Sequence, residues 1–129
     1  MGEEKRHPVL VVSTEWKTRA MLAAEVGERV PRDVVSVADV NEALGLIKAG
    51  GVDPAVMVVD AGQHIQPEDV RRLLEAKREV PLVLVVSRLR QEGFDALRAR
   101  CAACLARPVR IGFVAEKVVG LLEAENTAG

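Results

Sequence analysis

Residues 56–62 read Val56-Met57-Val58-Val59-Asp60-Ala61-Gly62, an apolar run that stops at one carboxylate and soon reaches a glycine. Four consecutive apolar residues with β-branched character predict a strand that is buried on both faces, as in a parallel sheet. Asp60 would then emerge at the carboxyl end of this strand. Open α/β sheets bind their ligands at that edge, so Asp60 is the first candidate for a functional residue.

Three further apolar runs stop at polar residues in the same way. They are Val9–Val12 before Ser13-Thr14-Glu15, Leu82–Val86 before Ser87, and Ala103–Ala106 before Arg107-Pro108. If these strands are parallel neighbours, the polar residues at their ends converge on one place. A fifth run, Val34–Val37, is interrupted by Ser36, and this interruption indicates an edge strand.

Helical patterns separate the strands. Asp39 is a candidate N-cap for a helix with an apolar stripe, and Pro67 suits the first turn of another. A shorter helix is predicted from about Gln91 to Arg100. Five strands alternating with five helices over short connections predict one doubly wound α/β domain, with a parallel sheet and helices on both faces.

Composition narrows the class of protein. The 129 residues fit one domain, and 49% hydrophobic residues supply a core. The net charge of −1 shows no basic face for direct nucleic-acid binding, and no apolar run is long enough to span a membrane. Two cysteines give no disulfide framework. We expect a soluble cytoplasmic protein with an N-terminal tail at 1–7, a domain at 8–124, and a tail or the start of a linker at 125–129.

With these strands and their terminal residues in this order, residues 8–124 resemble the receiver domain of two-component response regulators. The resemblance implies a flavodoxin-like fold with strand order 2-1-3-4-5. It also implies roles for single residues: Asp60 as the phosphoacceptor, Ser87 as the switch hydroxyl, and Arg107 in place of the family's lysine. Pro108 lies where the family has a cis peptide, and Cys104 lies at the family's aromatic switch position.

The sequence departs from the family at the positions that hold Mg²⁺. Ser13 and Thr14 replace the acidic pair at the end of the first strand, and Glu15 follows one residue later. Magnesium prefers six hard oxygen ligands, so Asp60, the backbone carbonyl of Gly62 and Glu15 would form a weak site.

Two states of Asp60 follow from these residues. As a phosphoacceptor it would need positive charge around the transferring oxygens, which Arg107 can supply, and a hydrogen bond from Ser87. As an unmodified carboxylate it would pair with Arg107 or with Arg88, which stands where the family has a small residue. The second state gives a pseudo-receiver, a binding module locked in one conformation.

The predicted function is an atypical receiver domain in two-component signalling, with weakened Mg²⁺-dependent phosphorylation, no enzymatic activity and action through protein–protein contacts. The expected partner is a histidine kinase or another signalling protein. The family also pairs through its fourth helix, fifth strand and fifth helix, so a homodimer through this face is a further expectation. Five apolar residues lie there and could equally be core: Phe94, Leu97, Cys104, Val109 and Phe113.

Two alternative functions remain open in the sequence. The first is a conventional receiver that a histidine kinase phosphorylates on Asp60. The second is a flavodoxin-like domain that binds a small molecule at the same edge, although two Phe, one Trp and no Tyr leave few rings to stack on a flavin. A redox or metal role for Cys101 and Cys104 is a weaker expectation than their use as small core residues.

Overall fold

The computed structural model describes residues 7–128, and the side chains of 7–124. Five parallel strands form one sheet in the order β2-β1-β3-β4-β5, which confirms the predicted fold class and strand order. The strands are β1 (Val9–Ser13), β2 (Val34–Val37), β3 (Val56–Ala61), β4 (Leu82–Ser87) and β5 (Ala103–Arg107). Because β2 pairs only with β1, its predicted edge position is confirmed as well.

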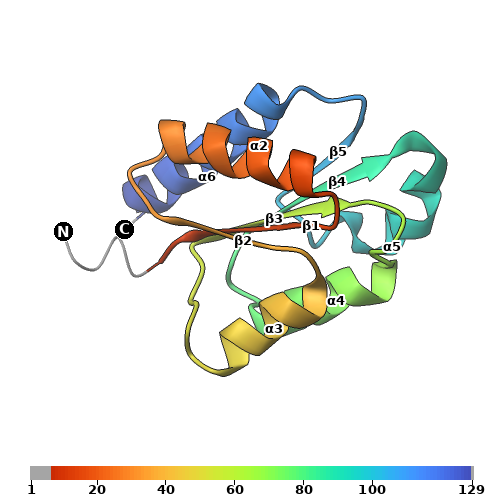
Figure 1. Ribbon diagram of the computed structural model, residues 1–129, viewed down its shortest axis with the longest axis horizontal. Coiled ribbons are helices and arrows are strands. Elements are labelled where there is room, and N and C mark those ends of the chain that lie inside the picture. Colours follow the sequence, from red (N-terminus) through yellow and green to blue (C-terminus); the bar gives the residue numbers. More distant parts are fainter. Residues whose placement is uncertain (1–6, 129) are drawn as a thin grey trace.

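Helices cover both faces of the sheet (Figure 1). On one face lie α2 (Trp16–Arg29) and α6 (Ile111–Ala128), and on the other lie α3 (Val40–Lys48), α4 (Pro67–Ala76) and the short α5 (Asp95–Arg98). Asp39 caps α3 as predicted, since its carboxylate accepts a hydrogen bond from the Glu42 amide at 2.7 Å. Pro67 occupies the first turn of α4.

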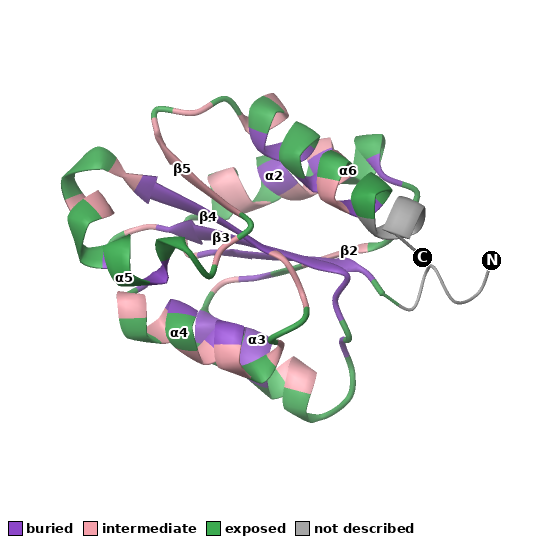
Figure 2. Cartoon of the chain, turned by 180° about the vertical axis from the view of Figure 1, so that it is seen from behind, coloured by how far each residue is buried: buried purple, intermediate pink, exposed green. Residues whose placement is uncertain are grey.

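The core consists of two apolar clusters, one on each face of the sheet. The central strands contribute to both, because successive side chains of a strand point to opposite faces. Val56 and Val58 pack with α2 and α6, whereas Met57 and Val59 pack with α3 and α4. Figure 2 shows these strands buried along their length. This double burial explains why the strands read as continuous apolar runs.

The predicted helix at 91–100 is wrong in type and extent. A 3₁₀ helix, η1 (Arg88–Phe94), takes its first part, and only Asp95–Arg98 is α-helical. Gly93 weakens helical structure at this point, and the Arg90 side chain is anchored on carbonyl groups of another loop. In this arrangement Phe94 and Leu97 are buried in the core, so neither belongs to an exposed pairing face.

The ends of the chain differ from the predicted tails. Residues 1–6 lie outside the described residues, but His7 contacts the backbone oxygen of Asp53 through Nδ1 at 3.1 Å. At the other end, α6 continues past residue 124 to Ala128. Among residues 7–128, no helix has the length and apolar character needed to cross a membrane.

Candidate functional site at the carboxyl edge of the sheet

Strand register places four polar residues on the α2/α6 side of the sheet. Ser13 lies opposite Asp60 on neighbouring strands, and Ser87 lies opposite Arg107. In each strand, the residue two positions before the polar one belongs to the apolar cluster on the face that α2 and α6 cover, here called the α2/α6 cluster. Residues two apart in a strand share a face. The side chains that precede them are Val11, Val58, Val85 and Leu105. The polar ends of the strands therefore converge, as the sequence predicts.

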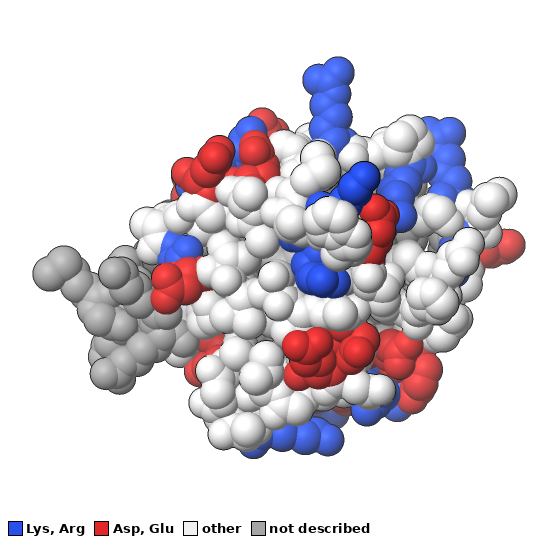
Figure 3. All heavy atoms as spheres, in the orientation of Figure 1, with Lys and Arg blue, Asp and Glu red and all other residues white. Residues whose placement is uncertain are grey.

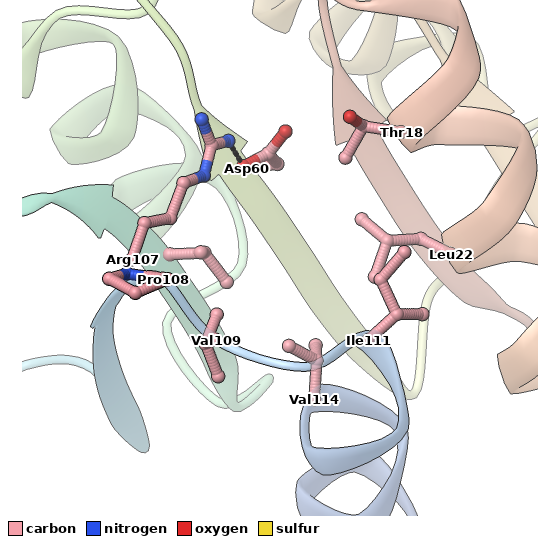
Figure 4. Close-up of a pocket in the computed structure, with 9 residues that line it drawn as sticks. Thr18, Leu22, Asp60, Arg107, Pro108, Val109, Ile111 and Val114 are labelled. Atoms are coloured by element: carbon pink, nitrogen blue, oxygen red, sulfur yellow. Dashed lines mark ion pairs between the residues drawn. The ribbon is translucent and has the colours of Figure 1, made fainter.

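Asp60 is buried, and both of its carboxylate oxygens have partners. Only 3% of the residue is exposed. Its Oδ1 forms an ion pair with Nη2 of Arg107, and its Oδ2 accepts a hydrogen bond of 2.9 Å from the Ser13 hydroxyl. Figure 4 shows the guanidinium of Arg107 reaching across to Asp60. A buried carboxylate is stable only when it is paired in this way, so Arg107 and Ser13 are what allow Asp60 to be buried as an anion.

A second arginine fixes the loop that follows Asp60. Arg90 donates hydrogen bonds to the backbone oxygen of Gly62 and, at 2.7 Å, to that of Ile65. Its guanidinium also lies 5.4 Å from the centre of the Phe94 ring. Arg90 is not among the site residues predicted from the sequence, which include Arg88 as a possible partner of Asp60. Arg88 is exposed, and Asp60 pairs with Arg107 and not with Arg88.

Thr14 and Glu15, from the β1–α2 connection, lie beside the site without joining it. Glu15 is exposed at the N-cap of α2, and its carboxylate accepts a hydrogen bond from the Thr18 hydroxyl at 3.1 Å. The Thr14 hydroxyl is so close to Gly62 that a Cβ at that position would meet it at 3.2 Å. A glycine at residue 62 therefore allows the two loops to approach each other.

The remaining predicted residues lie on β4 and β5. Ser87 is half-buried at the end of β4, and no hydrogen bond of its hydroxyl is found among the described residues. The Arg107-Pro108 peptide is cis, as predicted. Cys104 is half-buried in β5 and packs against the core on the α3/α4 side, away from Asp60.

The oxygen atoms near Asp60 do not fit a magnesium site. Magnesium demands an octahedral set of hard oxygens and is usually bound through one or two carboxylates together with water. Here Arg107 and Ser13 occupy the Asp60 oxygens, Arg90 occupies the Gly62 carbonyl, and the Glu15 carboxylate binds Thr18. Within the described part of the chain, no group of three or more His, Cys, Asp or Glu residues could hold a metal ion.

A cavity of about 270 Å³ opens beside the ion pair. Asp60, Arg107 and Thr18 lie at its polar end, and apolar side chains from α2, β4, the β5–α6 loop and α6 form its walls (Figure 4). The walls are Leu22, Val85, Pro108, Val109, Ile111 and Val114.

Cys101 is expected to react slowly. Burial, with a smaller contribution from the neighbouring Cys104, raises the pKa of the Cys101 thiol to about 11. Only the thiolate reacts, so at pH 8 the alkylation of Cys101 should be roughly a hundredfold slower than that of an ordinary thiol, and it should accelerate as the pH rises toward 11. Iodoacetamide labelling followed by peptide mapping measures this rate, with the urea-unfolded chain as the control. Equal rates in the folded and unfolded chains would contradict the prediction.

Comparison with known proteins identifies the fold. No family model matches the chain, and no curated protein matches it. A response regulator receiver domain from Clostridium thermocellum is similar in structure, with a TM-score of 0.77, 11% identity, and coverage of 95% of this chain and 99% of that one. The chain has the receiver fold.

Further structures share the receiver fold. The signal receiver domain of an HD domain-containing protein from Pseudomonas fluorescens has a TM-score of 0.76 and 14% identity, and covers 96% of this chain and 92% of its own. The response regulator TrrA from Thermotoga maritima, solved in complex with Mg²⁺ and BeF, has a TM-score of 0.73 and 19% identity, with coverage of 89% and 98%. The TM-scores establish the fold, and the low identities leave the chemistry of the site to be argued from its own residues.

Proposed function

We propose that this chain is an atypical receiver domain of two-component signalling, which acts through protein–protein contacts with its Asp60 carboxylate unmodified. One observation carries the proposal: both oxygens of Asp60 are already bound, one by Arg107 and one by Ser13. The positive charge beside Asp60 is the guanidinium of Arg107, which is part of the protein. The domain would therefore hold one conformation without a metal ion.

The arrangement opposes phosphoryl transfer to Asp60 in two ways. An attacking carboxylate oxygen must be free to approach phosphorus in line, and here each oxygen would first have to leave its partner. Charge on the transferring oxygens must also be neutralised, and Arg107 would have to serve both Asp60 and the phosphoryl group. We therefore propose that phosphorylation is weakened by competition for Arg107 as well as by the absence of an acidic pair at Ser13 and Thr14.

A conventional phosphoacceptor remains the second candidate, because the receiver fold places Asp60 at the end of β3, with Ser87 at the end of the neighbouring strand. In that case the ion pair between Asp60 and Arg107 would form only in the unphosphorylated protein, and it would break when a phosphoryl donor binds.

For the protein contacts, we propose the surface around the carboxyl edge, where large apolar side chains are exposed. Trp16 begins α2, Leu89 lies in η1 and Phe113 lies in the first turn of α6, and all three are among the exposed large hydrophobic residues. We place this protein in the cytoplasm. A histidine kinase or another signalling protein is the expected partner, and pairing of two copies through α5, β5 and α6 is also proposed.

The test uses Trp16, the single tryptophan of the chain, which is 65% exposed at the start of α2. Its fluorescence is followed during titration with Mg²⁺ and then beryllofluoride, while calorimetry measures Mg²⁺ binding, and Asp60→Asn serves as the control. The proposal predicts no saturable change in emission and no measurable Mg²⁺ binding. A saturable change that the Asn variant lacks would establish the conventional phosphoacceptor instead.

A further inference from the structure

The cavity beside Arg107 has the composition of a binding site for a small amphiphilic molecule. Its apolar walls come from four elements, and its polar groups lie together at one end (Figure 4). Binding pockets for small molecules are typically mostly apolar, with a few polar groups that orient the ligand, and they occur at the carboxyl edge of such sheets. Pockets for drug-sized molecules have volumes of about 300–1000 Å³. At about 270 Å³, this cavity is smaller and suits a ligand of roughly ten non-hydrogen atoms.

The polar end favours an anion. Arg107 gives one nitrogen, Nη2, to Asp60, and no other hydrogen bond or ion pair of its guanidinium occurs among the described residues. Its side chain is 38% exposed, so its remaining N–H groups can bind a second acceptor. Arginine matches a carboxylate in a planar, bidentate arrangement.

The surrounding charge is consistent with an anionic ligand. Arg88 begins η1 directly after β4, and Arg110 follows β5; both are exposed. Figure 3 shows Lys and Arg side chains at the upper right, with acidic side chains beside and below them. A positive surface beside the cavity attracts anions and disfavours cations.

We propose that this cavity binds a small monocarboxylate with an apolar tail, the carboxylate on the free edge of Arg107 and the tail between α2 and α6. The ligand joins the Asp60–Arg107 pair and does not replace it, because Asp60 uses only one of the guanidinium nitrogens. The domain would then sense a metabolite through the same arginine that holds Asp60. This proposal goes beyond the atypical receiver function and does not depend on whether Asp60 can be phosphorylated.

The test is a titration of the ¹⁵N-labelled protein with straight-chain carboxylates from propanoate to octanoate, followed by NMR chemical shifts, without Mg²⁺ or any phosphoryl donor. Affinity should rise about fourfold for each added methylene, the ratio that ~0.8 kcal/mol per buried methylene gives, and should level off once the cavity is full. 1-Hexanol should bind at least tenfold more weakly than hexanoate. Shifts should centre on Val85, Val109 and Ile111.

Two substitutions of the same kind separate the cavity from the rest of the surface. Val109→Phe fills the cavity and should weaken hexanoate binding at least tenfold, whereas Val119→Phe, also at a half-buried valine of the α2/α6 cluster but outside the cavity walls, should leave it unchanged. The double variant Asp60→Asn/Arg107→Met should remove the preference for hexanoate over 1-hexanol.

Three results would overturn the proposal. They are shifts that do not saturate, affinity that does not depend on chain length, and equal binding by the two phenylalanine variants. The wild-type chain-length series decides the question even if Val109→Phe fails to fold. The carboxylate titration contains no Mg²⁺, so an absence of binding in it leaves the proposed function untouched. A fluorescence change with beryllofluoride would likewise leave the carboxylate proposal untouched.

Discussion

Replacing Arg107 by Met should destabilise the folded protein by about 2 kcal/mol, because it leaves the carboxylate of Asp60 buried without a counter-ion. Removing one partner of a fully buried ion pair costs ~3–5 kcal/mol, and the expected value is lower here because Arg107 is 38% exposed and water can reach the site. Urea unfolding at pH 7, followed by circular dichroism, measures this difference in the free energy of unfolding.

The matched control for Arg107→Met is the double variant Asp60→Asn/Arg107→Met. An uncharged Asn keeps the hydrogen bond from Ser13 and needs no counter-ion, so the double variant should recover most of the loss. If Arg107→Met unfolds at the same urea concentration as the wild type, or if Asp60→Asn fails to rescue it, the ion pair does not stabilise the fold and the account of a locked Asp60 is wrong.

The largest loss of stability is expected from Phe94→Ala, at about 3–5 kcal/mol. Phe94 is 1% exposed in the apolar cluster on the face that α3 and α4 cover. Truncation therefore loses the free energy gained by burying the ring, and it also leaves a cavity. It also removes the ring on which the Arg90 guanidinium lies. A domain of this size is stable by ~5–15 kcal/mol, so this loss would remove a substantial fraction of its stability. Thermal and urea unfolding measure the effect.

The chain contains one other phenylalanine, which provides the control for this substitution. Phe113 is 43% exposed on α6, and Phe113→Ala should cost less than about 1 kcal/mol. The pair also tests the pairing face: Phe113→Ala should weaken any self-association of the protein, whereas Phe94→Ala should act through stability alone. Similar losses of stability in both variants would contradict the burial described here.

The strands were predictable because their sequences carry one dominant signal. Val9–Val12, Val56–Val59 and Leu82–Val86 are apolar at every position, and only a sheet covered on both faces buries such runs. The polar residue at the end of each run then marks the carboxyl edge, so Asp60, Ser13 and Arg107 could be brought together from the sequence alone.

The connection after β4 was not predictable in the same way. Phe94, Leu97 and Cys101 have helical spacing, but the backbone between Arg88 and Phe94 is a 3₁₀ helix. Local spacing cannot report the contact that accompanies this conformation, the hydrogen bonds from Arg90 to carbonyl groups 25 or more residues earlier in the chain. An arginine two residues after a predicted site residue gives no signal of its own. The same limit applies to Arg19 in the first turns of α2. Its side chain donates a hydrogen bond of 2.9 Å to the backbone oxygen of Ser13.

The cavity illustrates a further limit of the sequence. Its walls combine Leu22, Val85 and Val114, which belong to three separate elements and each read as ordinary core residues. Only the packing of α2 and α6 over the end of β4 shows that these side chains leave a space beside Arg107.

The most direct measurement of whether Asp60 is held by Arg107 and Ser13 is the intact mass of the protein after incubation with phosphoramidate and Mg²⁺, alongside Asp60→Asn. The account predicts that the wild-type chain gains no phosphoryl group at times when a conventional receiver is fully modified, because no carboxylate oxygen is free and no acidic pair holds the metal. A Mg²⁺-dependent mass increase of one phosphoryl group in the wild type, absent from Asp60→Asn, would contradict it.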